Sequence, residues 1–195
     1  MTGPDQPGVG APGGAEDAAA LAGAPDAFGR LWTPHRMAYI GGENKPTGGG
    51  AAQCPFCRAP EQDDATALIV HRGRDAYVVL NLYPYNPGHL LVCPYRHVAD
   101  LTDLTDAERH EVTDLSATAM RVLRRVSAPA GFNLGMNQGE VGGAGIAAHV
   151  HQHVVPRWAG DANFLAIVAQ TKALPQVLGD TREAVAAAWH EEASC

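Results

Sequence analysis

The chain is 195 residues long, the size of one ordinary domain, and 46% hydrophobic against 18% charged residues supplies a core. Its net charge of -7 argues against a nucleic-acid binder held mainly by a basic surface. No window approaches the roughly 18 continuous apolar residues of a membrane span, and the first residues lack the features of a secretory signal. We therefore expect a cytoplasmic protein with no nucleic-acid or membrane partner.

The front of the chain differs in composition from the rest. Residues 1–27 contain 18 Gly, Ala or Pro and predict a disordered tail. Residues 28–53 begin with large apolar side chains and end with a glycine-rich stretch, which predicts a docking segment followed by a flexible linker. From Cys54 onward, short apolar runs and turn residues follow one another regularly. We therefore expect residues 54–195 to form the domain together with a C-terminal extension.

Five short β-rich runs predict strands at residues 67–70, 76–80, 89–93, 132–136 and 150–155. A helix is predicted before the fourth strand, because Thr105 and Glu108 form a capping box and apolar residues then recur at three- and four-residue spacing. A terminal helix is predicted over residues 176–190. This order predicts an α+β fold with a mainly antiparallel sheet.

Three histidines alternate with other residues in the last predicted strand: His149, His151 and His153. Side chains alternate between the two faces of a strand, so all three point the same way, roughly 6–7 Å apart. Imidazole is a good nucleophile at neutral pH, and its attack on phosphorus gives a covalent phosphoramidate. Neighbouring imidazoles can fix its tautomer and bind anionic oxygens. Metal binding and a chance surface pattern are the alternatives.

Two further motifs carry chemistry. Residues 137–145 contain four glycines in nine residues, and such a segment can turn backbone N–H groups toward a phosphate, although a plain turn has the same composition. Cys54 and Cys57 have the spacing of a zinc knuckle, which needs two more ligands. A redox pair is less favoured, because the motif does not open a helix after a strand, and two free thiols are the remaining alternative.

The histidine run resembles the signature of the histidine triad superfamily, His-φ-His-φ-His-φ-φ with φ apolar. A second match is Asn81 followed by the segment 87–94, and the resemblance covers residues 54 to about 158. It implies a five-stranded antiparallel sheet with helices, usually joined to a twin in a homodimer. It also implies transfer or hydrolysis of nucleotidyl groups through a nucleotidyl-histidine.

The resemblance also assigns roles to individual residues. It makes His151 the nucleophile, with His149 and His153 as the other catalytic histidines, and it places His89 beside the phosphate. The other residues expected to bind substrate are Asn81 at the ribose and, near the phosphates, Asn137, Gly143, Gly145 and Arg157. For Arg157, an exposed charge at a strand end is an equal alternative. Gln152 and the pair Gly145–Ile146 depart from the family pattern, and the second departure leaves the leaving group and the acceptor open.

The resemblance to zinc-bearing members points to His97 and His149 as the partners of Cys54 and Cys57 in a structural zinc site. Residues 81–89 and 156–164 resemble the actinobacterial diadenosine tetraphosphate phosphorylase branch of the family. That branch splits dinucleoside polyphosphates, with inorganic phosphate as the acceptor. The alternatives are a hydrolase of nucleoside phosphoramidates or nucleotidyl adducts, a nucleotide-binding regulatory module without chemistry, and a zinc-stabilised interaction protein.

Overall fold

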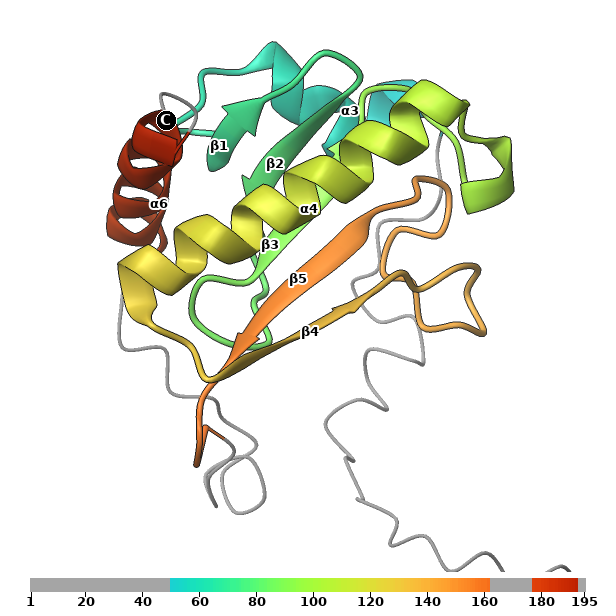
Figure 1. Ribbon diagram of the computed structural model, residues 1–195. Coiled ribbons are helices and arrows are strands. Elements are labelled where there is room, and N and C mark those ends of the chain that lie inside the picture. The colour runs from blue at the N-terminus through green and yellow to red at the C-terminus, as the bar shows by residue number, and fades with distance from the viewer. Residues whose placement is uncertain (1–49, 162–176, 193–195) are drawn as a thin grey trace, which may run out of the picture. The chain divides into compact units, whose positions relative to one another are not determined.

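The computed structural model describes residues 50–161 and 177–192 (Figure 1). The predicted tail, and the docking segment and linker up to residue 49, lie outside the described residues. No helix within these two ranges is both long enough and apolar enough to cross a membrane.

Five strands form one antiparallel sheet in the order β1-β2-β3-β5-β4 (Figure 1). Their bounds are β1 Ile69–Arg72, β2 Ala76–Leu80, β3 Leu90–Pro94, β4 Gly131–Gly135 and β5 Gln152–Arg157. The predicted α+β architecture with a five-stranded antiparallel sheet is therefore confirmed. In the register of the sheet, His153 on β5 lies between Leu91 on β3 and Gly135 on β4.

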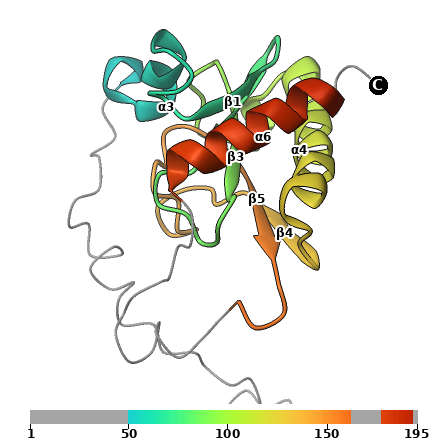
Figure 2. The ribbon, with the colours of Figure 1, turned by 90° about the vertical axis from the view of Figure 1, so that its left-hand side faces the viewer.

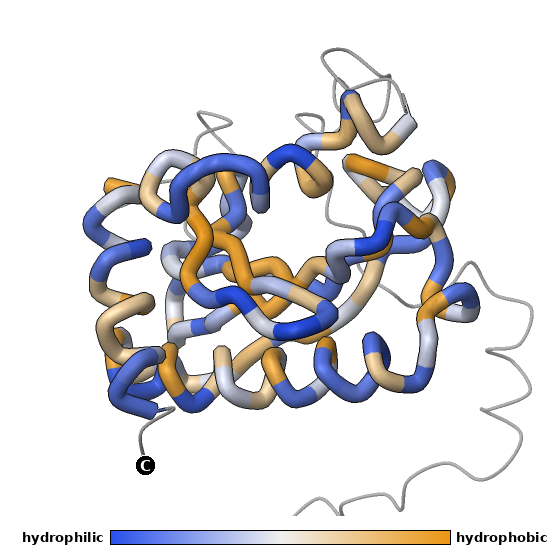
Figure 3. Tube along the Cα trace, turned by 90° about the horizontal axis from the view of Figure 1, so that it is seen from above, coloured by the Kyte–Doolittle hydropathy of each residue, from blue (hydrophilic) through white to orange (hydrophobic). Residues whose placement is uncertain are grey.

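Two helices cover one face of the sheet. α4, Asp106–Ser127, begins at the predicted capping box of Thr105 and Glu108 and runs across the strands (Figure 1). α6, Leu178–Glu192, packs beside α4 and against β1 (Figure 2). Between these helices and the sheet lies the larger apolar core, and polar residues of α4 face away from it (Figure 3). Because the two helices occupy this face of the sheet, the candidate functional residues lie on the opposite face.

The opposite face carries a smaller core made by alternate residues of the first three strands: Ile69, Tyr77, Val79, Leu91 and Cys93. Two short helical turns, α3 Pro55–Arg58 and η2 Ala59–Glu61, pack against it, and the exposed turn η1 Ala51–Gln53 precedes them. Phe56 of α3 packs against this core, and the Tyr77 hydroxyl donates a hydrogen bond of 2.7 Å to the Phe56 carbonyl. This contact fixes α3, and with it the two cysteines, over the sheet.

The last strand begins later than the sequence predicts. β5 starts at Gln152, so Val150 is not part of the ladder: its N–H donates to the carbonyl of Val98 at 2.7 Å. The local hydrophobic pattern could not reveal this competing partner from a distant loop. His149 and His151 therefore precede the strand and only His153 lies on it. The rings of His151 and His153 remain neighbours, with centroids 4.9 Å apart, and Phe56 contacts the rings of both His149 and His151. We call His149, His151 and His153 the histidine row.

Candidate active site

His151 is a buried, neutral ring with one free nitrogen lone pair. Its side chain is only 4% exposed, and its Nδ1 lies 2.8 Å from the His149 carbonyl oxygen. A carbonyl can only accept, so Nδ1 carries the proton and Nε2 keeps its lone pair. Burial lowers the pKa of His151, and the bond to the His149 carbonyl, which acts in the other direction, does not cancel this effect. The ring is thus uncharged near neutral pH.

Two more histidines form a hydrogen-bonded chain beside it. The backbone N–H of Tyr85 donates to the Nδ1 of His89 at 3.0 Å, and the Nδ2 of Asn81 lies 3.2 Å from the same atom. His89 must then carry its proton on Nε2, which lies 2.9 Å from the Nδ1 of His153. His153 accepts there and carries its own proton on Nε2. We call this chain from Tyr85 N–H through His89 to His153 the histidine relay.

The relay ends on a buried donor. The Nε2 of His153 is buried and has no hydrogen-bond partner among the described residues. A buried polar group without a partner is costly, so such groups frequently mark a functional site. Burial, followed by the neighbouring His151, lowers the pKa of His153 to about 4. His153 therefore offers an N–H from a neutral ring that lies beside the ring of His151.

A second cluster lies at the other end of the histidine row. One ligand atom from each of Cys54, Cys57, His97 and His149 lies within 4.8 Å of the others. The Nε2 of His149 lies 2.9 Å from the Pro94 carbonyl and so carries the proton. This leaves the Nδ1 lone pair facing the two sulfurs, at 3.4 and 3.5 Å. The four donors predicted as ligands are therefore brought together.

The pKa shifts of Cys57 and His149 keep both side chains neutral near pH 7. Burial and the neighbouring Cys54 raise the pKa of the Cys57 thiol to about 11. Burial also lowers the pKa of His149 to about 4, which keeps its ring neutral and able to coordinate. A dication reverses the preference of the thiols and binds them as thiolates, because it offsets the charge that burial disfavours. Two cysteines and two histidines are a donor set typical of structural zinc sites.

The other predicted substrate residues divide into two groups. Asn81 is half-buried and touches the relay, while Asn137 is half-buried just after β4. Gly143, with a φ of 85°, and Gly145 belong to the loop that leads into the histidine row, and the positive φ at Gly143 is strained for any other residue.

Arg157 is not brought to the histidines. It lies six residues beyond His151 at the far end of β5, roughly 20 Å along the strand. There its guanidinium pairs with the Asp161 carboxylate at 2.7 and 3.0 Å and donates to Asn133. Its charge is engaged in holding the end of β5, as the exposed strand-end alternative anticipates.

Two residues at the site were not singled out from the sequence. The ring of Phe56 lies 4.8 Å from that of His151 and 5.6 Å from that of His149, so it bridges the cysteine knuckle and these two histidines. The ring of Tyr85 covers the relay, with centroids 4.8 Å from His89 and 5.7 Å from His153. Phe56 could have been found from its place between the two cysteines, whereas no sequence signal linked Tyr85 to a histidine 68 residues away.

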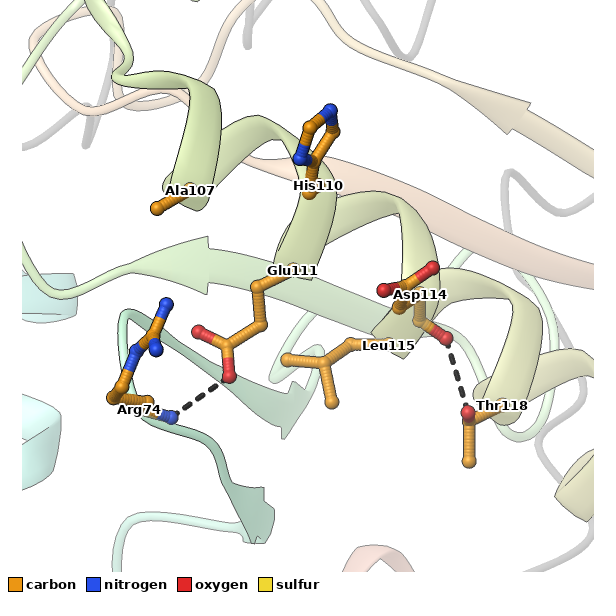
Figure 4. A pocket seen from close by; sticks show the side chains of 7 residues that line it. All are labelled: Arg74, Ala107, His110, Glu111, Asp114, Leu115 and Thr118. Atoms are coloured by element: carbon orange, nitrogen blue, oxygen red, sulfur yellow. Dashed lines mark hydrogen bonds between the residues drawn. The ribbon is translucent and has the colours of Figure 1, made fainter.

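A separate pocket lies along the polar side of α4 (Figure 4). Its lining residues are Arg74, Ala107, His110, Glu111, Asp114, Leu115 and Thr118. The Glu111 carboxylate accepts the backbone N–H groups of Arg74, Asp75 and Ala76, so it clamps the turn between β1 and β2. Because this acid is satisfied within the protein and no predicted site residue lines the pocket, we assign the contact to stability.

Comparison with known proteins agrees with this geometry. The family model described as "HIT domain" matches residues 62–160, half of the chain. A Mycobacterium tuberculosis protein named AP-4-A phosphorylase is 48% identical over 167 residues, which cover 84% of this chain and 86% of the relative. The chain belongs to the histidine triad (HIT) family. Because a relative this similar is named as a phosphorylase, the chain is an enzyme of that family.

More distant relatives are consistent with this assignment. The asymmetrical bis(5'-nucleosyl)-tetraphosphatase of Schizosaccharomyces pombe is 32% identical over 93 residues, 48% of this chain and 50% of the relative. Among solved structures, a zinc-bound HIT family protein from Mycobacterium smegmatis superposes with a TM-score of 0.61 at 24% identity, covering 74% of this chain and 99% of that one. At that identity, the superposition supports the fold alone.

Proposed function

We propose that this HIT enzyme cleaves dinucleoside polyphosphates of the diadenosine tetraphosphate type by passing a nucleotidyl group through His151 to inorganic phosphate. The observation that carries the proposal is the pairing of two buried rings with complementary free atoms. His151 presents a lone pair and His153 presents an N–H donor. The substrate class is that named for the Mycobacterium tuberculosis relative.

In the first half-reaction, the Nε2 of His151 attacks the α-phosphorus and forms a P–N bond. The P–O bond to the remaining polyphosphate breaks, and that leaving group takes the electron pair. The Nε2–H of His153 donates to a phosphoryl oxygen and stabilises the charge that develops there. The Nδ1–H of His151 stays on the His149 carbonyl, which stabilises the positive charge of the phosphorylated ring.

In the second half-reaction, an oxygen of inorganic phosphate attacks the same phosphorus. The P–N bond breaks, its electron pair returns to His151, and a nucleoside diphosphate is released. With water in place of phosphate, the product is a nucleoside monophosphate. In this scheme Asn81 binds the ribose, while Asn137 and the backbone at Gly143 and Gly145 bind the phosphates.

Turnover of diadenosine tetraphosphate with labelled inorganic phosphate tests this proposal. We expect label in the nucleoside diphosphate, ping-pong kinetics, and a His151→Ala variant slower by on the order of 10³-fold or more. His153→Asn should be slower by about 10²-fold, because its shorter side chain cannot donate from the position of the imidazole Nε2, while the nucleophile is kept. Near-normal turnover by His151→Ala refutes the mechanism. Unlabelled monophosphate identifies a hydrolase instead, and tight mononucleotide binding without turnover identifies a regulatory module.

We further propose that the cluster of Cys54, Cys57, His97 and His149 holds a structural zinc ion. When bound, zinc supplies a tetrahedral cross-link between α3, the end of β3 and the histidine row, with no open position for catalysis. Metal analysis should give one zinc per chain, lost in Cys57→Ser and kept in Cys93→Ala, whose thiol lies outside the cluster. Retention of zinc by Cys57→Ser would contradict the assignment.

We also propose a homodimer in the cytoplasm. β4 pairs only with β5 among the described strands, so its other edge is open to a second copy, and Leu134 on it is 46% exposed. Sedimentation should give twice the chain mass, and a monomer at micromolar concentration would overturn this part. A reducing compartment fits the location, because the two proposed cysteine ligands of zinc must stay reduced.

A further inference from the structure

Tyr85 lies in the loop between β2 and β3 and contacts the histidine relay in two ways. Its backbone N–H is the first donor of the relay, at 3.0 Å from the Nδ1 of His89. Its ring lies against both imidazoles, tilted by 34° to His89 and stacked at 21° to His153. One residue therefore touches both members of the pair, through main chain and side chain.

We propose that Tyr85 is a positioning residue of the relay: its N–H fixes the tautomer of His89, and its ring shields the His89–His153 pair so that the Nε2–H of His153 stays directed at the phosphoryl group. This inference rests on the proposed function for the identity of the group that receives the donor. The contacts of Tyr85 with the relay do not depend on the proposed function.

The shielding follows from burial. His89 is fully buried, whereas Tyr85 is 42% exposed, so the tyrosine ring is the outer wall between solvent and the imidazoles. A protonated His153 would carry a hydrogen on Nδ1, directly opposite the Nε2–H of His89 at 2.9 Å. Two donors would then face each other, so the relay must break when His153 gains a proton.

Among the described residues, the titratable groups that face His153 are His89, His151 and Tyr85 itself. No carboxylate of this part of the chain is among the groups that shift its titration. Exclusion of water is the largest cause of its low pKa, and the ring of Tyr85 supplies part of that exclusion.

The loop holds Tyr85 firmly in this place. On one side, the Oδ1 of Asn81 accepts the N–H of Tyr83 at 3.0 Å. On the other side, the Nδ2 of Asn86 donates to the Pro156 carbonyl at 3.0 Å and to the Asp161 carboxylate at 2.7 Å. The loop is thus tied to the end of β5, which gives the ring a defined position over the relay.

The test compares Tyr85→Ala, which keeps the N–H and loses the ring, with Tyr85→Phe, which keeps both. Tyr83→Ala is the matched control, because Tyr83 is a neighbouring aromatic in the same loop and 81% exposed. The ring resonances of His153, assigned with His153→Asn, are titrated by NMR without substrate. The pH dependence of kcat and KM for diadenosine tetraphosphate is measured in parallel.

We expect Tyr85→Ala to raise the pKa of His153 by about one or more, and to move the acidic limb of the kcat profile upward by the same amount. At about pH 4, where the wild-type ring is half protonated and the variant ring is mostly protonated, kcat should fall by roughly fivefold with a smaller change in KM. Tyr85→Phe should restore the wild-type titration, and Tyr83→Ala should not alter it.

An unchanged His153 titration in folded Tyr85→Ala overturns the proposal. So does a Tyr85→Phe variant that behaves like Tyr85→Ala, since the effect would then belong to the phenol group. If Tyr85→Ala fails to fold, Tyr85→Leu replaces it, because it fills space without an aromatic face. A shifted His153 titration in a protein whose wild type does not cleave dinucleotides would support the positioning role while refuting the proposed function.

Discussion

Acidification should destabilise the folded protein through His153. In the unfolded chain this ring has its ordinary pKa of about 6.5, whereas burial in the folded protein lowers it to about 4. At a pH between these two pKa values, the ring is protonated in the unfolded chain and neutral in the folded protein. The free energy of unfolding therefore falls as the pH drops from about 6.5 to about 4, and this contribution is complete below about pH 4.

The size of the effect follows from the difference of about 2.5 between the two pKa values. At about 1.4 kcal/mol for each pKa unit, His153 removes up to about 3 kcal/mol, a large part of the 5–15 kcal/mol typical of a domain. The lowered pKa values of His71, His149 and His151 act in the same direction, so wild-type stability alone does not isolate His153.

Urea unfolding of wild type and His153→Asn, with metal content matched, separates the contribution of His153 to the pH dependence of stability from that of the other histidines. The asparagine amide keeps an acceptor for the His89 Nε2–H but does not titrate, and the remaining histidines cancel in the difference. From about pH 7 to pH 4, the stability difference should shift by about 3 kcal/mol in favour of the variant. Two parallel curves would show that His153 titrates normally in the folded protein and would refute the relay geometry.

Two further substitutions test the framework of the site. Gly88→Ala should cost about 1–2 kcal/mol, because Gly88 has a φ of 72° and an added Cβ would lie 3.2 Å from the Cδ2 of Leu123. Gly135→Ala, with open space around it, is the control, and equal unfolding midpoints for the two variants would contradict this reasoning. Glu111→Ala should cost about 3 kcal/mol, because three backbone N–H groups lose a charged acceptor. Amide exchange at Asp75 and Ala76 should accelerate with it, and unchanged exchange would show that Glu111 is not the clamp.

The sequence by itself determined the local elements and the chemistry of the motifs. Turn residues and capping residues act on their immediate neighbours, so the five strands and the start of α4 at Thr105 could be predicted. Alternation placed His151 and His153 side by side, and the Cys54–Cys57 spacing predicted a metal knuckle that the fold completes with His97 and His149. Local spacing carries this information because side-chain direction repeats with backbone geometry.

Only the tertiary structure decided which atoms of the histidines are free. The proton positions depend on the His149 carbonyl, the Pro94 carbonyl and the Tyr85 N–H, all backbone groups without a sequence signal. The fold also placed Arg157 at the end of β5 that is remote from the histidines, because its distance from them is set by strand length. Hydrogen-bond partners distant in the chain are chosen by packing, so spacing alone could not reveal them.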